Sequence, residues 1–167
     1  MPIKLKKLLL HSCDVDLDAL AGSTLPKYLE RLELLNCDCS PHLEKLLQDP
    51  ACKIWEISLD QNKYLTPALF QDGTSLRQLT LLDIPNDQAL LSQICRSIEG
   101  LRIKELRTLA EISLLEDCIN NNANSKLWFL ELQHVHLSFA QVVGQVLKSP
   151  YCKLESFSLI YGKNPRK

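Results

Sequence analysis

The chain has 167 residues, of which 35 are leucine, and its 19 lysines and arginines nearly balance its 20 aspartates and glutamates. A balanced charge gives no reason to expect a nucleic acid or an anionic membrane as partner. The combination of 46% hydrophobic and 23% charged residues excludes a disordered chain. We expect no membrane span, because no apolar run reaches about 18 residues, and no secretory signal peptide, because lysines return within the first seven residues.

One apolar spacing recurs along the chain: an apolar residue, two free positions, a second apolar residue, one free position and a third apolar residue. It occurs at Leu5–Leu8–Leu10, Leu29–Leu32–Leu34, Ile54–Ile57–Leu59, Leu76–Leu79–Leu81, Ile103–Leu106–Thr108, Leu127–Leu130–Leu132 and Leu154–Phe157–Leu159. The copies start 22 to 27 residues apart, and the fifth copy is degraded. Alternation with a period of two residues is typical of strands, so each copy predicts a strand.

The stretches between these copies show the apolar spacing of short helices. In chain order, we expect helices at 17–21, 41–47, 66–71, 88–98, 112–119 and 139–147. Asn86 or Asp87 caps the helix at 88–98, and Gly100 ends it. Each unit is therefore a strand, a turn, a helix and a turn. A single unit cannot bury its leucines, so neighbouring units are expected to stack into a parallel α/β solenoid.

A small residue or an asparagine, namely Cys13, Cys37 and Asn62, follows the strand pattern in the first three units. The complete pattern resembles the leucine-rich repeat, LxxLxLxx(N/C)xL. Two segments, Asp49-Pro50-Ala51-Cys52-Lys53-Ile54 and Ser149-Pro150-Tyr151-Cys152-Lys153-Leu154, are similar to the ribonuclease-inhibitor-like subclass. The resemblance implies one domain over residues 1–167 with about seven repeats of 22–27 residues, irregular near 101–126. It also implies a curved parallel sheet on the concave side and short helices on the convex side.

In this family the positions between the fixed apolar residues face the concave surface and bind partners. The residues expected to bind a partner protein are Leu9, Arg31, Glu33, Leu35, Trp55, Glu56, Asp60, Leu82, Arg107, Leu109, Trp128, Phe129 and Glu131. The apolar members lie where water is expected, and exposed apolar surface often marks a binding site. A structural alternative is that a tight inner curve lets these side chains shield one another. The two tryptophans equally suit packing at the strand edges.

Chemistry-bearing motifs are scarce in this sequence. It contains no GxxxxGK[ST], GxSxG, HExxH or GxGxxG motif, so we expect no enzyme and no cofactor. Cys37 and Cys39 with His42 and Cys52 form only a weak metal pattern, because both thiols of Cys37-x-Cys39 are expected to point inward, and we expect no metal. The seven cysteines are an odd number, which favours buried free thiols in a reducing compartment, the cytoplasm.

The expected function is a non-enzymatic module for protein–protein interaction. The resemblance implies three settings: an inhibitor-like scaffold, a sensing array of a NOD-like receptor, or a bacterial effector in the host cytoplasm. An alternative is a substrate-recognition subunit of a ubiquitin ligase, because the segment Ser113–Cys118 resembles an elongin-binding box, although Asn122 breaks its last position. No polar capping unit is evident at either end of the repeats. We therefore expect a longer array or self-association through the ends.

Overall fold

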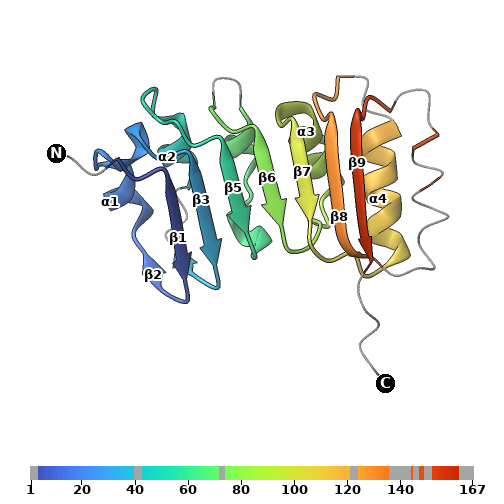
Figure 1. Cartoon of the computed structure of the whole chain (residues 1–167), viewed down its shortest axis with the longest axis horizontal. Helices are drawn as coiled ribbons and strands as arrows, with labels where there is room; N and C mark the ends of the chain where they lie inside the picture. Colours follow the sequence, from blue (N-terminus) through green and yellow to red (C-terminus); the bar gives the residue numbers. More distant parts are fainter. Residues whose placement is uncertain are drawn as a thin grey trace.

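The computed structural model of the chain describes residues 4–39, 43–71, 74–120, 124–135, 144, 147–148 and 152–161. Seven strands in this part of the chain form one open parallel sheet, in which each strand pairs with the next of the series (Figure 1). The strands are β1 (Lys7–His11), β3 (Arg31–Leu35), β5 (Glu56–Leu59), β6 (Gln78–Leu81), β7 (Gly100–Ile103), β8 (Phe129–Val135) and β9 (Ser156–Tyr161). The predicted mixed α/β class with a parallel sheet is confirmed.

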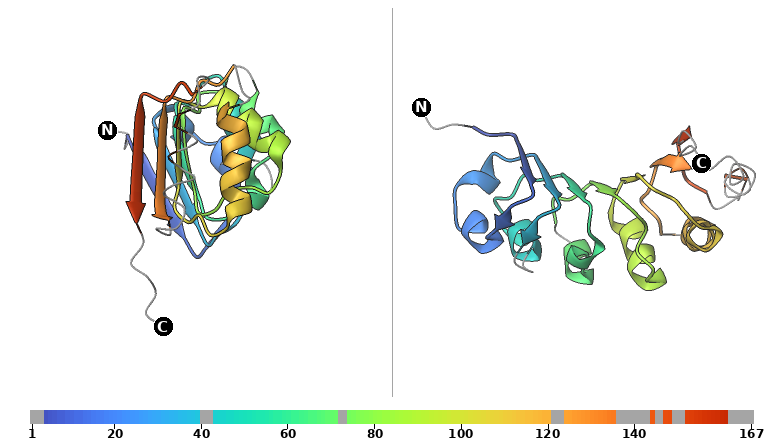
Figure 2. Two further views of the ribbon diagram at one scale, coloured as in Figure 1. Left: turned by 90° about the vertical axis from the view of Figure 1, so that its right-hand side faces the viewer. Right: turned by 90° about the horizontal axis from the view of Figure 1, so that it is seen from below.

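The helices of the described residues lie on one face of this sheet (Figure 2). They are α1 (Leu17–Ala21), η1 (Leu25–Lys27), α2 (Leu43–Gln48), η2 (Asn62–Tyr64), η3 (Pro67–Phe70), α3 (Gln88–Ser97) and α4 (Leu109–Asn120), where η denotes a 3₁₀-helix. Seen from below, the sheet bends away from the helices, so its free face is concave (Figure 2). The helix expected at 139–147 falls largely on residues outside the described part of the chain.

Apolar side chains from neighbouring strands lie in two rows on the helix side of the sheet. The first row joins Leu8, Leu32, Ile57, Leu79, Leu101, Leu130 and Phe157, and the second joins Leu10, Leu34, Leu59, Leu81, Ile103, Leu132 and Leu159. With the inner faces of the helices, they build one continuous core. Full burial of such a side chain stabilises the fold by about 1.5–3 kcal/mol, so stacking of the units is the main source of stability.

The fifth strand differs from the prediction. Leu101 and Ile103 lie opposite Leu79 and Leu81, whereas the sequence pattern placed Leu106 and Thr108 there. The error arose at Gly100, which we expected to end a helix. The helix α3 instead ends at Ser97, Ile98 is already extended (φ −105°, ψ 157°), and Gly100 opens the strand β7. The fifth apolar copy is therefore Ile98–Leu101–Ile103, five residues earlier than predicted.

Local signals fix the ends of several elements. The carboxylate of Asp87 accepts hydrogen bonds from the backbone N–H groups of Ala89 (2.9 Å) and Leu90 (3.1 Å), and so caps α3. Asp16 caps α1 in the same way, through the N–H of Ala19 at 3.0 Å. None of the helices in the described residues combines the length and the apolar content that crossing a membrane requires.

Candidate interaction surface

The concave face consists of three rows of side chains that run across the strands, on the side opposite the helices. The first row is Lys7, Arg31, Glu56, Gln78, Gly100, Phe129 and Ser156; the second is Leu9, Glu33, Ser58, Thr80, Arg102, Glu131 and Ser158. The third row follows two residues later, at His11, Leu35, Asp60, Leu82, Lys104, Gln133 and Ile160. The regular register brings residues from all seven units onto one surface.

Arg102 lies at the centre of this face and joins three strands. Its Nη1 lies 3.2 Å from Glu56 Oε1 on β5, and its Nε lies 3.5 Å from Glu131 Oε2 on β8. To reach β5, the guanidinium passes over β6, where the residue in the same row as Arg102 is Thr80, which has a small side chain. The guanidinium carbon of Arg102 also lies 5.2 Å from the ring centroid of Phe129, within the range of a cation–π contact.

Gly100 makes room for this arrangement. A Cβ atom at this position would lie 3.2 Å from Gln78 Cγ on one side and 3.2 Å from Phe129 Cδ1 on the other, which is tighter than ordinary van der Waals contact. The side chains of β6 and β8 therefore close over the glycine. A glycine inside a strand often marks such a close approach.

Two further ion pairs lie toward the N-terminal end of the face. Lys7 Nζ lies 2.9 Å from Glu33 Oε1, and Arg31 Nε lies 3.0 Å from Glu56 Oε2. Arg31 also stands over the ring of Trp55, with its guanidinium carbon 5.1 Å from the centroid. Opposite charges on adjacent strands stabilise a sheet. Because charges of both signs alternate on it, the concave face carries no large patch of a single charge.

Apolar side chains are most exposed toward the two ends of the concave face. Leu9 on β1 is 52% exposed and Ile160 on β9 is 45% exposed. Leu35, Leu82 and Phe129 are half-buried between their neighbours. The face thus offers apolar surface at its ends and a paired polar centre.

Two predicted site residues do not lie on the concave face. Leu109 is the first residue of α4, and Arg107 lies in the segment before it, where its guanidinium pairs with Glu105. Both were assigned from the shifted fifth repeat; the true fifth unit contributes Gly100, Arg102 and Lys104 instead. Leu9, Arg31, Glu33, Leu35, Glu56, Asp60, Leu82, Phe129 and Glu131 do lie in the three rows. The sequence prediction missed Arg102, which the correct apolar register would have placed.

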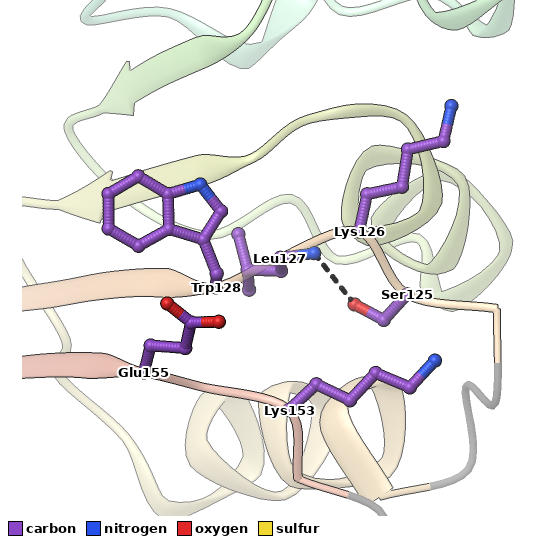
Figure 3. Close-up of a pocket in the computed structure, with 6 residues that line it drawn as sticks. All are labelled: Ser125, Lys126, Leu127, Trp128, Lys153 and Glu155. Atoms are coloured by element: carbon purple, nitrogen blue, oxygen red, sulfur yellow. Dashed lines mark hydrogen bonds between the residues drawn. The ribbon is translucent and has the colours of Figure 1, made fainter.

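Trp55 and Trp128 stand just before their strands, at the edge of the face. Trp55 is covered by Arg31, whereas Trp128 is 40% exposed and packs its ring against Phe129 at a centroid distance of 6.0 Å. Trp128 lines a pocket of about 390 Å³ with Ser125, Lys126, Leu127, Lys153 and Glu155. Trp128 and Glu155 lie on one side of this pocket, and the lysine side chains extend on the other (Figure 3).

Most of the thiols that the structure describes lie in or beside the core. Burial raises the pKa of Cys95 to about 12, and it raises the pKa of Cys52 and Cys118 as well. Cys37 is buried and donates a hydrogen bond to the carbonyl of Leu10 at 3.3 Å. Among the described residues, no group of three or more His, Cys, Asp or Glu side chains is placed to hold a metal ion. His42 lies outside the described residues.

Comparisons with protein-family models, with curated proteins and with solved structures find no match for this chain. Its function is therefore inferred from the geometry of the concave face itself.

Proposed function

We propose that the chain is a leucine-rich-repeat solenoid that acts as a non-enzymatic module and binds a protein partner through its concave face. The observation that carries the proposal is the free sheet face, on which side chains from seven strands form one registered surface. The opposite face of the same sheet is covered by helices (Figure 2). A face of this extent, free of covering elements in the described part of the chain, supports a role in binding.

The chemistry of the concave face favours a protein over a polyanion. Its arginines are already paired with Glu56 and Glu131, so they offer little net charge to a phosphate backbone. Arginine and aromatic side chains are enriched among the residues that dominate protein interfaces. Leu9 and Ile160 add exposed apolar area at the two ends, where a partner would remove it from water.

A substrate-recognition subunit of a ubiquitin ligase is less well supported. The helix that resembles an elongin-binding box is α4, in which Cys118 is buried and Leu114, the leucine of the box, packs partly buried against the core. A ligase adaptor would need these side chains to leave the core. The settings of an inhibitor-like scaffold, a sensing array and a bacterial effector all remain compatible with the proposal, because each uses the same concave face.

Photo-crosslinking from chosen positions tests the proposal. A photoreactive amino acid replaces His11 or Ser158 on the concave face, and the matched controls carry it at Asp18 or Ala89 on the helices. In extracts of the source cells, we expect one protein to be crosslinked from both concave positions and from neither helix position. Crosslinking of that protein with equal yield from the helix positions would contradict the proposal.

Binding of the purified partner then supplies an affinity. Leu9→Asp places a charge in the expected interface, and Ala89→Asp places the same charge on the exposed surface of α3. We expect Leu9→Asp to weaken binding at least tenfold, which corresponds to about 1.4 kcal/mol, and Ala89→Asp to leave it unchanged. If both variants bind with the affinity of the wild type, the N-terminal end of the face is not part of the interface.

A further inference from the structure

The turns that follow β1 and β3 run side by side and have the same shape. Ser12 and Asn36 occupy equivalent positions with positive φ values of 53° and 49°, and Asn36 Nδ2 donates a hydrogen bond to Ser12 Oγ at 3.0 Å. Beyond the turns, the short strands β2 (Asp14–Val15) and β4 (Asp38–Cys39) pair in parallel. The backbone is thus held in register on both sides of Cys13 and Cys37.

This register brings two thiols together. Cys13 Sγ and Cys37 Sγ lie 3.8 Å apart. Their backbones run at the spacing of paired strands, roughly 4.8 Å, which falls inside the range of about 4.4–6.8 Å between the Cα atoms of a disulfide. The Tyr64 hydroxyl donates a hydrogen bond to the Cys37 carbonyl at 2.7 Å and fixes the inner partner. To form a bond, the sulfur atoms would have to approach from this distance to the roughly 2.0 Å of a disulfide.

The two thiols differ in their access to solvent. Cys37 is buried, with 2% of its surface exposed, whereas Cys13 is half-buried. Cys13 lines an open pocket of about 300 Å³ with Ser12, Asp14 and Asn36. A small reagent can therefore reach the outer sulfur, while the inner sulfur can react only with its neighbour.

We propose that Cys13 and Cys37 form a modification site that reacts with a low-molecular-weight disulfide and ends as a disulfide bond between the two cysteines. The thiolate of Cys13 attacks one sulfur of the reagent RSSR, the S–S bond of the reagent breaks, and RS⁻ leaves and takes up a proton. The sulfur of Cys37 then attacks Cys13 Sγ, the new mixed disulfide breaks, and a second RSH is released. The two cysteines lose two electrons and two protons, and the reagent gains them as two thiols.

The bond would tie the first two units of the sheet together. It closes a loop from residue 13 to residue 37, which spans α1, η1 and β3. The same units carry Leu9 and the Lys7–Glu33 pair, so the modification would rigidify the N-terminal end of the concave face. The proposal does not depend on what that face binds, because it rests on the two turns alone.

Peptide mapping after treatment with oxidised glutathione tests the proposal. The folded chain is incubated with the reagent, quenched with acid, alkylated and digested, and the products are measured by mass spectrometry. Cys39 lies two residues from Cys37 and shares its tryptic peptide, so the assignment is made in a Cys39→Ser background. We expect a Cys13–Cys37 disulfide in the wild type and in Cys39→Ser, reversed by dithiothreitol, with Cys95 and Cys118 still reduced.

Single substitutions separate the two steps. In Cys37→Ser the reaction should stop at a glutathione adduct on Cys13, and in Cys13→Ser no adduct should form on Cys37. Cys37→Ala serves as a second variant if the serine disturbs the fold, which circular dichroism monitors. The oxidised wild type should melt roughly 5–10 °C above its reduced form. A Cys13 that is alkylated by a thiol reagent but forms no bond to Cys37 would overturn the proposal, as would equal oxidation of the buried thiols.

Discussion

Replacement of Arg102 by methionine removes the cation at the centre of the concave face and keeps most of its apolar stem. The side chain of Arg102 is 32% exposed, and those of its partners Glu56 and Glu131 are each 18% exposed. Both carboxylates therefore keep little contact with water when the cation is lost. Glu56 retains Arg31, but Glu131 keeps only the hydrogen bond from the side-chain amide of Gln133 among its described partners.

The expected loss follows from these contacts. Fully buried pairs cost about 3–5 kcal/mol when one partner is removed, and exposed pairs about 0.2–1 kcal/mol. The pairs of Arg102 lie between these limits, at about 1 kcal/mol each, and the cation–π contact with Phe129 adds about 0.5–1 kcal/mol. We expect Arg102→Met to lower the free energy of unfolding by about 2–3 kcal/mol.

Urea unfolding at neutral pH, followed by circular dichroism, measures this loss, and an unchanged m-value shows that the change lies in stability. Arg77→Met is the matched control. Arg77 lies 3.5 Å from Glu99 with side chains 50% and 47% exposed, and its replacement should cost less than about 1 kcal/mol. Equal costs for the two variants would refute the view that Arg102 holds the centre of the face together.

Three further predictions address the core, a helix cap and the buried thiols. Leu32→Ala, at a fully buried position of β3, should lower the free energy of unfolding by about 2–5 kcal/mol, as measured by urea titration. Asp87→Ala removes the cap of α3 and should cost about 1 kcal/mol, whereas Asp87→Asn should cost a few tenths; equal losses would contradict capping. Burial raises the pKa of Cys95 from 9.0 to about 12. The unfolded chain therefore releases this proton first, and stability should fall as the pH rises from 9 toward 12; Cys95→Ala should flatten that slope.

Most of the sheet could be predicted from the sequence, because strand register depends on the leucine spacing alone. In six of the seven units the predicted apolar residues are those that lie opposite one another. The register of such a strand is fixed by its two-residue period, because a shift by one residue would turn every core leucine toward water. The apolar lattice is therefore strongly specified wherever the spacing is intact.

The prediction of the fifth strand was wrong because glycine serves two different structural purposes. Glycine commonly ends helices, and Gly100 follows a helical stretch at a suitable distance. In the folded chain it serves close packing instead, beneath Gln78 and Phe129. That requirement comes from strands more than 20 residues away on either side, so local sequence could not reveal it. Because of this five-residue error, the prediction left Arg102 out of the concave face and wrongly assigned Arg107 and Leu109 to it.

The proximity of Cys13 and Cys37 could have been predicted from the sequence, but the difference in their access to solvent could not. Both cysteines occupy the same position after successive copies of the apolar pattern, and parallel pairing of the strands places equivalent positions side by side. The exposure of each thiol depends on the unit that follows or precedes it. Tyr64 of the next unit contacts the turn of Cys37, whereas Cys13 lies in the outermost described turn. Sequence periodicity predicts neighbours, but not their access to solvent.

The curvature of the sheet follows from a mismatch between its two sides. Strands stack about 4.8 Å apart, whereas an α-helix with its side chains is about 10 Å wide. Successive units can satisfy both spacings only if the helix side is spread and the strand side is compressed, as Figure 2 shows. Units that use a 3₁₀-helix such as η3 need less width than the unit of the α-helix α4, because a 3₁₀-helix is wound more tightly. The shape of the concave face is thus set in part by residues on the opposite side of the molecule, so a change of helix type there would alter the curvature of the face.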